Sequence, residues 1–165
     1  MSGPQLEFRE YVRNRADALH RTAYLLCGDW HIAQDLTQET LANAFRNWHR
    51  VQQAHSADAY VRRILLNVAR QRWRGRRNRA PVSVATTEPH VPDATEEIVE
   101  RAELFGALLR LPLRQRATIV LRYLDGLSER ETAATLGCSQ GTVKSQTARA
   151  LTSLRTFLDR TESTL

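Results

Sequence analysis

Residues 127–154 read LSERETAATLGCSQGTVKSQTARALTSL, and this stretch predicts two short helices joined by a tight turn. Ser128 and Glu131 have the spacing of a capping box at the start of the first helix. Gly137 stands where the turn needs a positive φ, which glycine adopts without strain. Ser139 can then cap the second helix. The stretch therefore predicts where both helices begin and where the chain turns between them.

The same spacing is typical of a DNA-binding helix-turn-helix, whose second helix enters a major groove. Ala133 is small where the two helices must approach, and Val143 faces back toward the first helix. The polar side chains of the second helix project outward: Gln140, Thr142, Lys144, Ser145 and Arg149. The alternative is an ordinary helical hairpin with a polar outer face. A DNA-binding helix-turn-helix is favoured, because the cap, the small residue, the turn glycine and the inward valine all occur at the spacing that this motif requires.

Composition limits the remaining possibilities. A chain of 165 residues forms one ordinary domain or two small ones. No apolar run approaches the roughly 20 residues that span a membrane, and residues 1–15 lack the hydrophobic core of a signal peptide. We therefore expect a cytoplasmic protein without membrane insertion. Cys27 and Cys138 form no CxxC pair, so small buried thiols are expected. The five histidines make no zinc-ligand spacing with them, and neither metal nor cofactor is expected.

The charge is unevenly distributed. The net charge of +6 and the pI of about 10.1 favour a polyanionic partner, nucleic acid before membrane. Residues 1–79 carry 14 Arg against 7 acidic residues, and residues 104–165 carry 9 basic against 5 acidic residues. Residues 80–103 carry 1 Arg and 6 acidic residues. Two basic bodies are thus joined by an acidic segment.

Apolar periodicity predicts an all-α fold of two small helical domains. The domains are expected at 1–79 and 96–165, joined by a flexible acidic linker at 80–95 that holds three of the five prolines. Besides the helix-turn-helix, with its last helix fading after Leu158, helices are expected over 6–27, 30–49, 58–79, 96–111 and 113–125. A loop is expected over 50–58. Side chains expected to face the core include Phe45, Ile98, Leu104, Leu108 and Leu111.

The helix expected over 58–79 combines an apolar face with many arginines. No acidic residue occurs from Ala59 through Thr87, so the helix repels itself unless anions lie against it. Phosphates are the obvious anions. Trp73 lies among the arginines, and both base stacking and core packing are open, with core packing favoured. The alternative for the cluster is a solvated basic tail, but the regular apolar face favours a built surface.

Catalysis by this chain alone is not expected. Asp35 and Glu39 are four residues apart, but no second acidic pair completes a metal or acid–base site with them. The sequence also has no Gly-rich phosphate loop and no nucleophile with its base.

Three motifs together resemble the extracytoplasmic-function RNA polymerase sigma factors of the sigma-70 family, with the SigE-like subfamily as the nearest likeness. Residues 35–48 read DLTQETLANAFRNW, which is similar to the segment that binds the clamp coiled coil of core polymerase. Residues 59–77 read AYVRRILLNVARQRWRGRR, similar to the segment that reads and melts the minus-ten element. Residues 109–151 resemble the reader of the minus-thirty-five element with its lead-in helix. The likeness covers nearly everything from Phe8 to Leu158.

This resemblance implies a sigma factor that binds core RNA polymerase and promoter DNA and directs initiation. It assigns polymerase contacts at the clamp to Asp35, Gln38 and Glu39, and at the flap to Leu124 and Leu127. It assigns minus-ten contacts to Arg63, Asn67, Arg70, Trp73, Arg74 and Arg77, with the loop 50–58 holding a flipped base. It assigns minus-thirty-five contacts to Ser139, Gln140, Thr142, Lys144, Ser145, Gln146 and Arg149. An anti-sigma factor is a further partner that the family implies.

Two positions depart from the family pattern. Gln71 stands where many members carry Asp, and Gln146 where many carry Arg. Gln can pair bidentately with adenine in the major groove, so an unusual minus-thirty-five preference is expected.

Two other functions stay open. A free-standing helix-turn-helix regulator would explain 127–154 but leaves 1–79 without a role. A protein-interaction adaptor would leave the arginine-rich helix unexplained.

Overall fold

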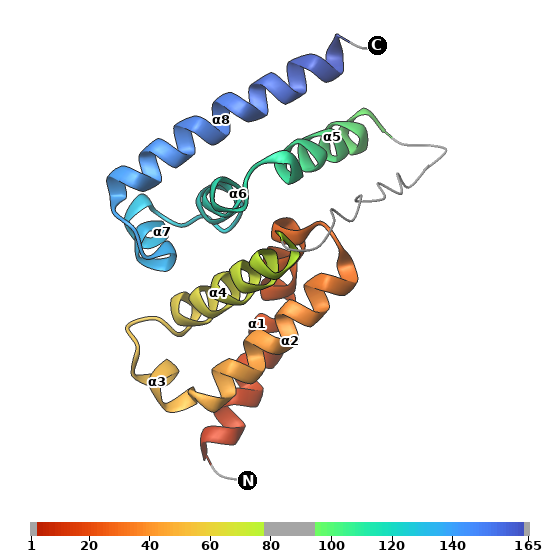
Figure 1. Cartoon of the computed structure of the whole chain (residues 1–165). Coiled ribbons are helices and arrows are strands. Elements are labelled where there is room, and N and C mark those ends of the chain that lie inside the picture. The colour runs from red at the N-terminus through yellow and green to blue at the C-terminus, as the bar shows by residue number, and fades with distance from the viewer. Residues whose placement is uncertain (1–2, 78–94, 164–165) are drawn as a thin grey trace.

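The computed structural model of the chain describes residues 3–77 and 95–163, and all regular structure in these residues is helical (Figure 1). The elements in order are α1 (Gly3–Cys27), α2 (Trp30–Arg46), α3 (Trp48–Gln53), α4 (Ala57–Arg77), α5 (Glu96–Arg110), α6 (Leu113–Ile119), the π-helical turn η1 (Val120–Leu124), α7 (Glu129–Leu136) and α8 (Gln140–Glu162). The all-α prediction is confirmed. The predicted linker lies outside the described residues except for Thr95.

The N-terminal unit, residues 3–77, packs α1 and α4 against α2. Gly28 ends α1 with a φ of +74°, which suits a residue without Cβ. Asp29 then starts α2, because its side chain accepts a hydrogen bond from the Ile32 N–H at 3.0 Å. Leu36 of α2 and Leu65 of α4 are fully buried in the resulting core.

The end of α2 differs from the prediction. The expected helix over 30–49 breaks at Asn47, whose side-chain amide donates to the Asn43 carbonyl at 3.0 Å. A second short helix, α3, follows this break. Its side chains Trp48 and Val51 are both buried, which holds it against the core. The predicted loop 50–58 is therefore only the segment 54–56. Phe45, expected in the core, is 49% exposed and packs at the surface against Phe8 instead, with ring centroids 5.0 Å apart.

The C-terminal unit, residues 95–163, places α6 between α5, α8 and the short α7 (Figure 1). Leu108 and Leu111 are buried as expected. Ile98 and Leu104 are 48% and 49% exposed, so their predicted inward orientation is wrong. The apolar periodicity of α5 predicts burial correctly only in the second half of the helix, because only that half packs on the rest of the molecule. The helix α8 runs to Glu162, beyond the predicted fading at Leu158.

The helix-turn-helix forms as predicted. The Ser128 hydroxyl accepts from the Glu131 N–H at 3.0 Å, and the Glu131 carboxylate accepts from the Ser128 N–H at 3.1 Å. The bond from the Ser128 N–H to the carboxylate is the largest of the influences that hold the pKa of Glu131 below its ordinary value, and the Ser128 hydroxyl lowers it further. Gly137 has a φ of +68°, and the Ser139 hydroxyl accepts from the Thr142 N–H at 3.1 Å. Ala133 and Val143 are buried between the two helices.

Arg116 is the most unusual residue of the core, because its guanidinium is buried and its side chain is long and charged. Its N–H groups donate to the carbonyls of Leu108 at 3.1 Å and of Leu109 and Leu111 at 2.8 Å, at the end of α5. A further N–H donates to the carbonyl of Leu26, at the end of α1. Burial lowers the pKa of Arg116. Because carbonyls at helix C-termini lack partners and carry partial negative charge, one cation satisfies the ends of two helices.

We expect Ser128→Ala to lower the free energy of unfolding by about 1 kcal/mol, since it leaves an N–H of α7 without its acceptor. Ser128→Asn is the matched control, because Asn caps as well as Ser, and it should stay near the parent value. Urea unfolding followed by circular dichroism measures both. Equal losses in the two variants would contradict the role of the cap.

Candidate nucleic-acid interface

The basic surface of α4 is a single exposed face. Arg63, Asn67, Arg70 and Arg74 lie four, three and four residues apart, and all four are exposed. We call this set the arginine face. Steps of three and four put side chains on one side of a helix. Three cations on one side of α4 can bind the phosphates of one DNA strand.

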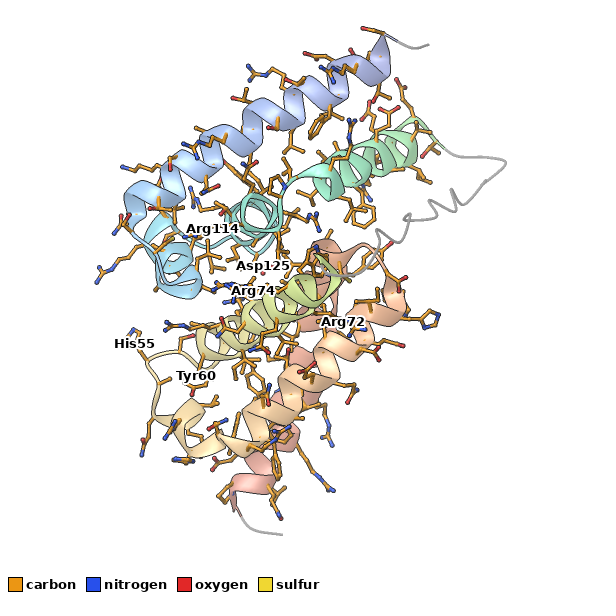
Figure 2. The ribbon with its side chains drawn as sticks, in the orientation of Figure 1. His55, Tyr60, Arg72, Arg74, Arg114 and Asp125 are labelled. Carbon is orange, nitrogen blue, oxygen red and sulfur yellow. The ribbon has the colours of Figure 1, made fainter. Side chains whose placement is uncertain are left out.

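The other two residues predicted to contact the minus-ten element, Trp73 and Arg77, are not part of the arginine face. Trp73 is half-buried, and its ring centroid lies 5.9 Å from the guanidinium carbon of Arg116. This position favours packing over base stacking, the two alternatives that the sequence leaves open. Arg77 ends α4, and its side chain lies outside the described residues. Arg72, which no motif singled out, pairs with Asp35 of α2 at 3.6 Å (Figure 2 labels Arg72 and Arg74).

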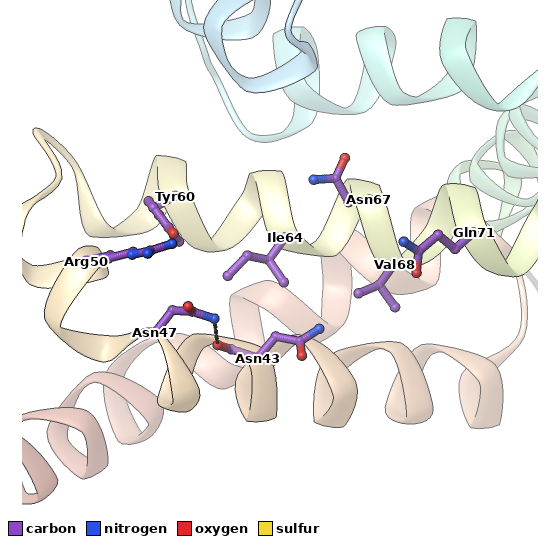
Figure 3. A pocket seen from close by; sticks show the side chains of 8 residues that line it. All are labelled: Asn43, Asn47, Arg50, Tyr60, Ile64, Asn67, Val68 and Gln71. Carbon is purple, nitrogen blue, oxygen red and sulfur yellow. Dashed lines mark hydrogen bonds between the residues drawn. The ribbon is translucent and has the colours of Figure 1, made fainter.

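A pocket of about 330 Å³ opens between α2, α3 and α4, beside the arginine face (Figure 3). Its apolar floor comes from Ile64 and Val68, which point toward α2. Asn67 of the arginine face also lines the pocket. Its full lining is Asn43, Asn47, Arg50, Tyr60, Ile64, Asn67, Val68 and Gln71. The pocket thus combines an aromatic ring, an apolar floor and several amide donors and acceptors.

Sequence reasoning located this pocket only in part. The range 50–58 supplies Arg50, but from α3 and not from a loop. Asn43 and Asn47 were missed, although two amides four residues apart near a helix end are the signal that marks them. Tyr60 of α4 is half-buried and forms part of the pocket wall.

The helix-turn-helix presents the second candidate surface. Gln140, Lys144, Ser145 and Arg149 are exposed on α8, whereas Thr142 and Gln146 are half-buried. The hydroxyls of Ser139 and Thr142 lie 2.9 Å apart and form a hydrogen bond with one another at the helix cap. Lys144 pairs weakly with Glu129 of α7 at 3.8 Å. The readiest base and phosphate contacts are therefore those of the four exposed side chains.

The residues predicted to contact polymerase differ in their exposure to solvent. Asp35, Gln38 and Glu39 are all exposed on α2. Leu124 is 54% exposed, but Leu127 is only 5% exposed because it packs into the core of the C-terminal unit. The Leu127 side chain is thus buried in this structure, and its assigned contact with polymerase stays a prediction.

Asp125 lies between the two units (Figure 2). The Thr22 hydroxyl of α1 donates to its carboxylate at 3.1 Å, and Arg62 of α4 pairs with it at 3.8 Å. Burial raises the pKa of Asp125, while Thr22 and the cations Arg62 and Arg21 lower it, and burial is the largest of these influences.

Other chemistry is not indicated by the described residues. Within residues 3–77 and 95–163, no three His, Cys, Asp or Glu side chains gather as a metal site requires. Cys27 and Cys138 are free thiols. Both are half-buried, whereas buried thiols were expected. Among the helices described, none is long and apolar enough to cross a membrane.

Comparisons with known proteins cover both units. The family model for sigma-70 region 2 matches residues 11–79, and the model for sigma-70 region 4 matches residues 101–154. The RNA polymerase sigma-E factor of Streptomyces coelicolor is 44% identical over 93% of this chain and 86% of its own length. The extracytoplasmic-function sigma factor SigE of Mycolicibacterium smegmatis is 36% identical over 93% of this chain and 62% of its own length.

Among solved structures, the sigma factor RpoE of Bartonella quintana is similar, with a TM-score of 0.74 and 26% identity. The match covers 93% of this chain and 97% of that chain, which was solved in complex with the anti-sigma factor NepR. Sequence and structure thus point to the same family over nearly the whole chain.

We expect Arg70→Ala to reduce the salt dependence of single-stranded DNA binding, with the slope of log K against log salt falling by about 0.7 for one lost phosphate contact. Arg72→Ala is the matched control and should change the slope less, because Asp35 already neutralises Arg72. Fluorescence anisotropy with a short mixed-sequence oligonucleotide at several salt concentrations measures both slopes. A larger change in the Arg72 variant would contradict the assignment.

Proposed function

Because the chain belongs to the extracytoplasmic-function sigma factors of the sigma-70 family, which bind core RNA polymerase and direct initiation at promoters, we propose a division of that work between its two units. The N-terminal unit melts and reads the minus-ten element, and the C-terminal unit binds the minus-thirty-five duplex. The observation that carries this proposal is the arginine face directly beside the pocket on α4. RNA synthesis itself is the work of the polymerase.

The pocket is proposed to receive one base flipped out of the minus-ten strand. Taking a base out of its stack costs a few kcal/mol, which a fitted pocket can return. Ile64 and Val68 offer an apolar floor, Tyr60 a ring for stacking, and Asn43 and Asn47 hydrogen-bonding amides. The arginine face then holds the neighbouring phosphates, which positions the strand without reading its sequence.

The minus-thirty-five element is proposed to bind at the start of α8. Gln140 and Lys144 are exposed in its first two turns, and Arg149 follows on the same helix. This is the part of a recognition helix that contacts base edges in helix-turn-helix proteins. Lys144 must leave Glu129 to do so, and the pair is exposed and weak.

Two protein partners are proposed. Core polymerase would bind Asp35, Gln38 and Glu39 at its clamp and Leu124 at its flap, because these side chains are exposed. The predicted flap contact at Leu127 is not proposed, since that side chain is buried. An anti-sigma factor is proposed as well, by analogy with the complex of RpoE and NepR. The free-standing regulator is not favoured, because the likeness to sigma factors extends over both units.

Mixing the purified chain with core RNA polymerase and mapping starts on fragmented host DNA tests the function. We expect stable binding and discrete start sites. Asn67→Ala and Lys144→Ala should lower initiation at those sites by about fivefold or more, since each good base contact contributes roughly 1–3 kcal/mol. Thr156→Ala, at an exposed position late on α8, is the control and should initiate normally. Specific duplex binding without any polymerase binding would refute the proposal.

Gln146→Arg should shift the minus-thirty-five preference among these start sites, because Gln and Arg favour different base edges. Sequencing of starts from a randomised promoter library measures the shift. An identical set of selected sequences would show that Gln146, which is half-buried, does not read DNA.

A further inference from the structure

Tyr11 of α1 contacts two segments that carry walls of the pocket, although it is not part of the pocket lining. Its ring packs on Trp48, the first residue of α3, with ring centroids 5.5 Å apart. Its hydroxyl donates to the Asp58 carboxylate, in the first turn of α4, at 3.0 Å. One half-buried side chain of α1 therefore connects the start of α3 to the start of α4.

Two pocket residues follow these contacts along the chain. Arg50 stands two residues after Trp48, and Tyr60 stands two residues after Asp58. At about 3.6 residues per turn, side chains two residues apart point roughly 200° apart around the helix axis. Because Trp48 and Asp58 face α1, the residues that follow them face away from it. Arg50 and Tyr60 accordingly line the same end of the pocket (Figure 3).

The contact at Asp58 is well supported. Tyr11 donates to one carboxylate oxygen, and Arg15 of α1 pairs with the other at 3.3 Å. Only 27% of the Asp58 side chain is exposed, so water competes less for these contacts. Burial and the charge of Asp58 raise the pKa of Tyr11 above its ordinary value, so the hydroxyl keeps its proton and remains the donor. Because a bond to an ionised acceptor is stronger than a neutral one, this contact can fix the start of α4.

The connection from α3 to α4 is short and bonded at both ends. It consists of residues 54–56. The Ala54 N–H donates to the carbonyl of Arg50 at 3.0 Å, and the Ser56 hydroxyl accepts from the Ala59 N–H at 3.2 Å. This connection leaves the two helices little freedom along the chain, so the separation of the pocket walls depends on the support that α1 gives them from behind.

We propose that Tyr11 is a positioning residue for the flipped base, because its contacts with Trp48 and Asp58 hold the two pocket walls at a fixed separation. The inference rests on the proposed function, in which this pocket receives a base of the minus-ten strand. Walls that are already in place need not be ordered when the base enters, so more of the stacking free energy remains for binding. Tyr11 thus acts on the base through the pocket walls and does not touch it.

Four variants test this role. Tyr11→Phe removes the hydroxyl and keeps the ring that packs on Trp48, so the fold should be retained. Tyr24→Phe is the matched control, because it removes the same atom from α1 at a residue whose ring stacks on Phe105. Asp58→Ala removes the acceptor of the hydrogen bond instead of its donor. Asp58→Asn is the conservative variant, because its amide oxygen can still accept from Tyr11.

The measurement uses the complex of the chain with core RNA polymerase and a promoter taken from the mapped start sites. The minus-ten strand of this promoter is kept single-stranded, and each of its bases in turn is replaced by an abasic site. The ratio of the two affinities, with and without the base, reports what that base contributes to binding. A loss of stability alone lowers both affinities alike and leaves this ratio unchanged.

In the parent, we expect removal of one base to weaken binding by about tenfold, which is the effect of losing one stacked base. Tyr24→Phe and Asp58→Asn should keep a ratio near the parent value. Tyr11→Phe and Asp58→Ala should reduce the ratio to about threefold or less, because each removes a hydrogen bond that holds a pocket wall.

An unchanged ratio in Tyr11→Phe would overturn the proposal, and so would an equal reduction in Tyr24→Phe. Either result, with a clear base effect in the parent, would leave the proposed function of the pocket intact. If no base of the minus-ten strand matters in the parent, the pocket does not receive a base, and the proposed function and the role of Tyr11 are both refuted.

Discussion

The buried guanidinium of Arg116 is the interaction on which the rest of the structure depends. The helix α5 ends at Arg110, with Leu111 as its cap before Pro112, and leaves carbonyls without partners within the helix. The last turn of α1 does the same at the Leu26 carbonyl. One planar cation with several donors satisfies both sets, which a neutral side chain could not do. The residue that completes the core of the C-terminal unit is therefore also the residue that attaches it to the N-terminal unit.

Recognition of DNA is divided in a way that suits this construction. In the proposed division of work, the face of α4 supplies cations and a pocket for single-stranded DNA, while α8 supplies a polar helix face for duplex DNA. The two surfaces belong to units that share one continuous hydrophobic core and have further contacts along α1.

Much of this was predictable because it depends on local chemistry. The capping box at Ser128, the positive φ of Gly137 and the cap at Asp29 follow from neighbouring residues alone. The errors concern side chains whose position depends on distant parts of the chain, such as Phe45 at the surface. The pocket was located only in part because its walls come from three helices. The interface between the units was not predicted at all, since no pattern along the chain reports which helix ends meet.

The ion pair between Arg72 and Asp35 has a consequence for how the two proposed partners influence one another. Asp35 is proposed to bind polymerase, and Arg72 stands in the sequence of α4 between Arg70 and Arg74 of the arginine face. Docking of the carboxylate on polymerase would release the guanidinium for a phosphate, so the two binding events are thermodynamically coupled and each favours the other by the same factor. An exposed pair of this kind contributes about 0.2–1 kcal/mol, so the factor is small, roughly fivefold at most. If both proposed contacts form, the direction of this coupling makes the assembly of polymerase, sigma factor and promoter cooperative.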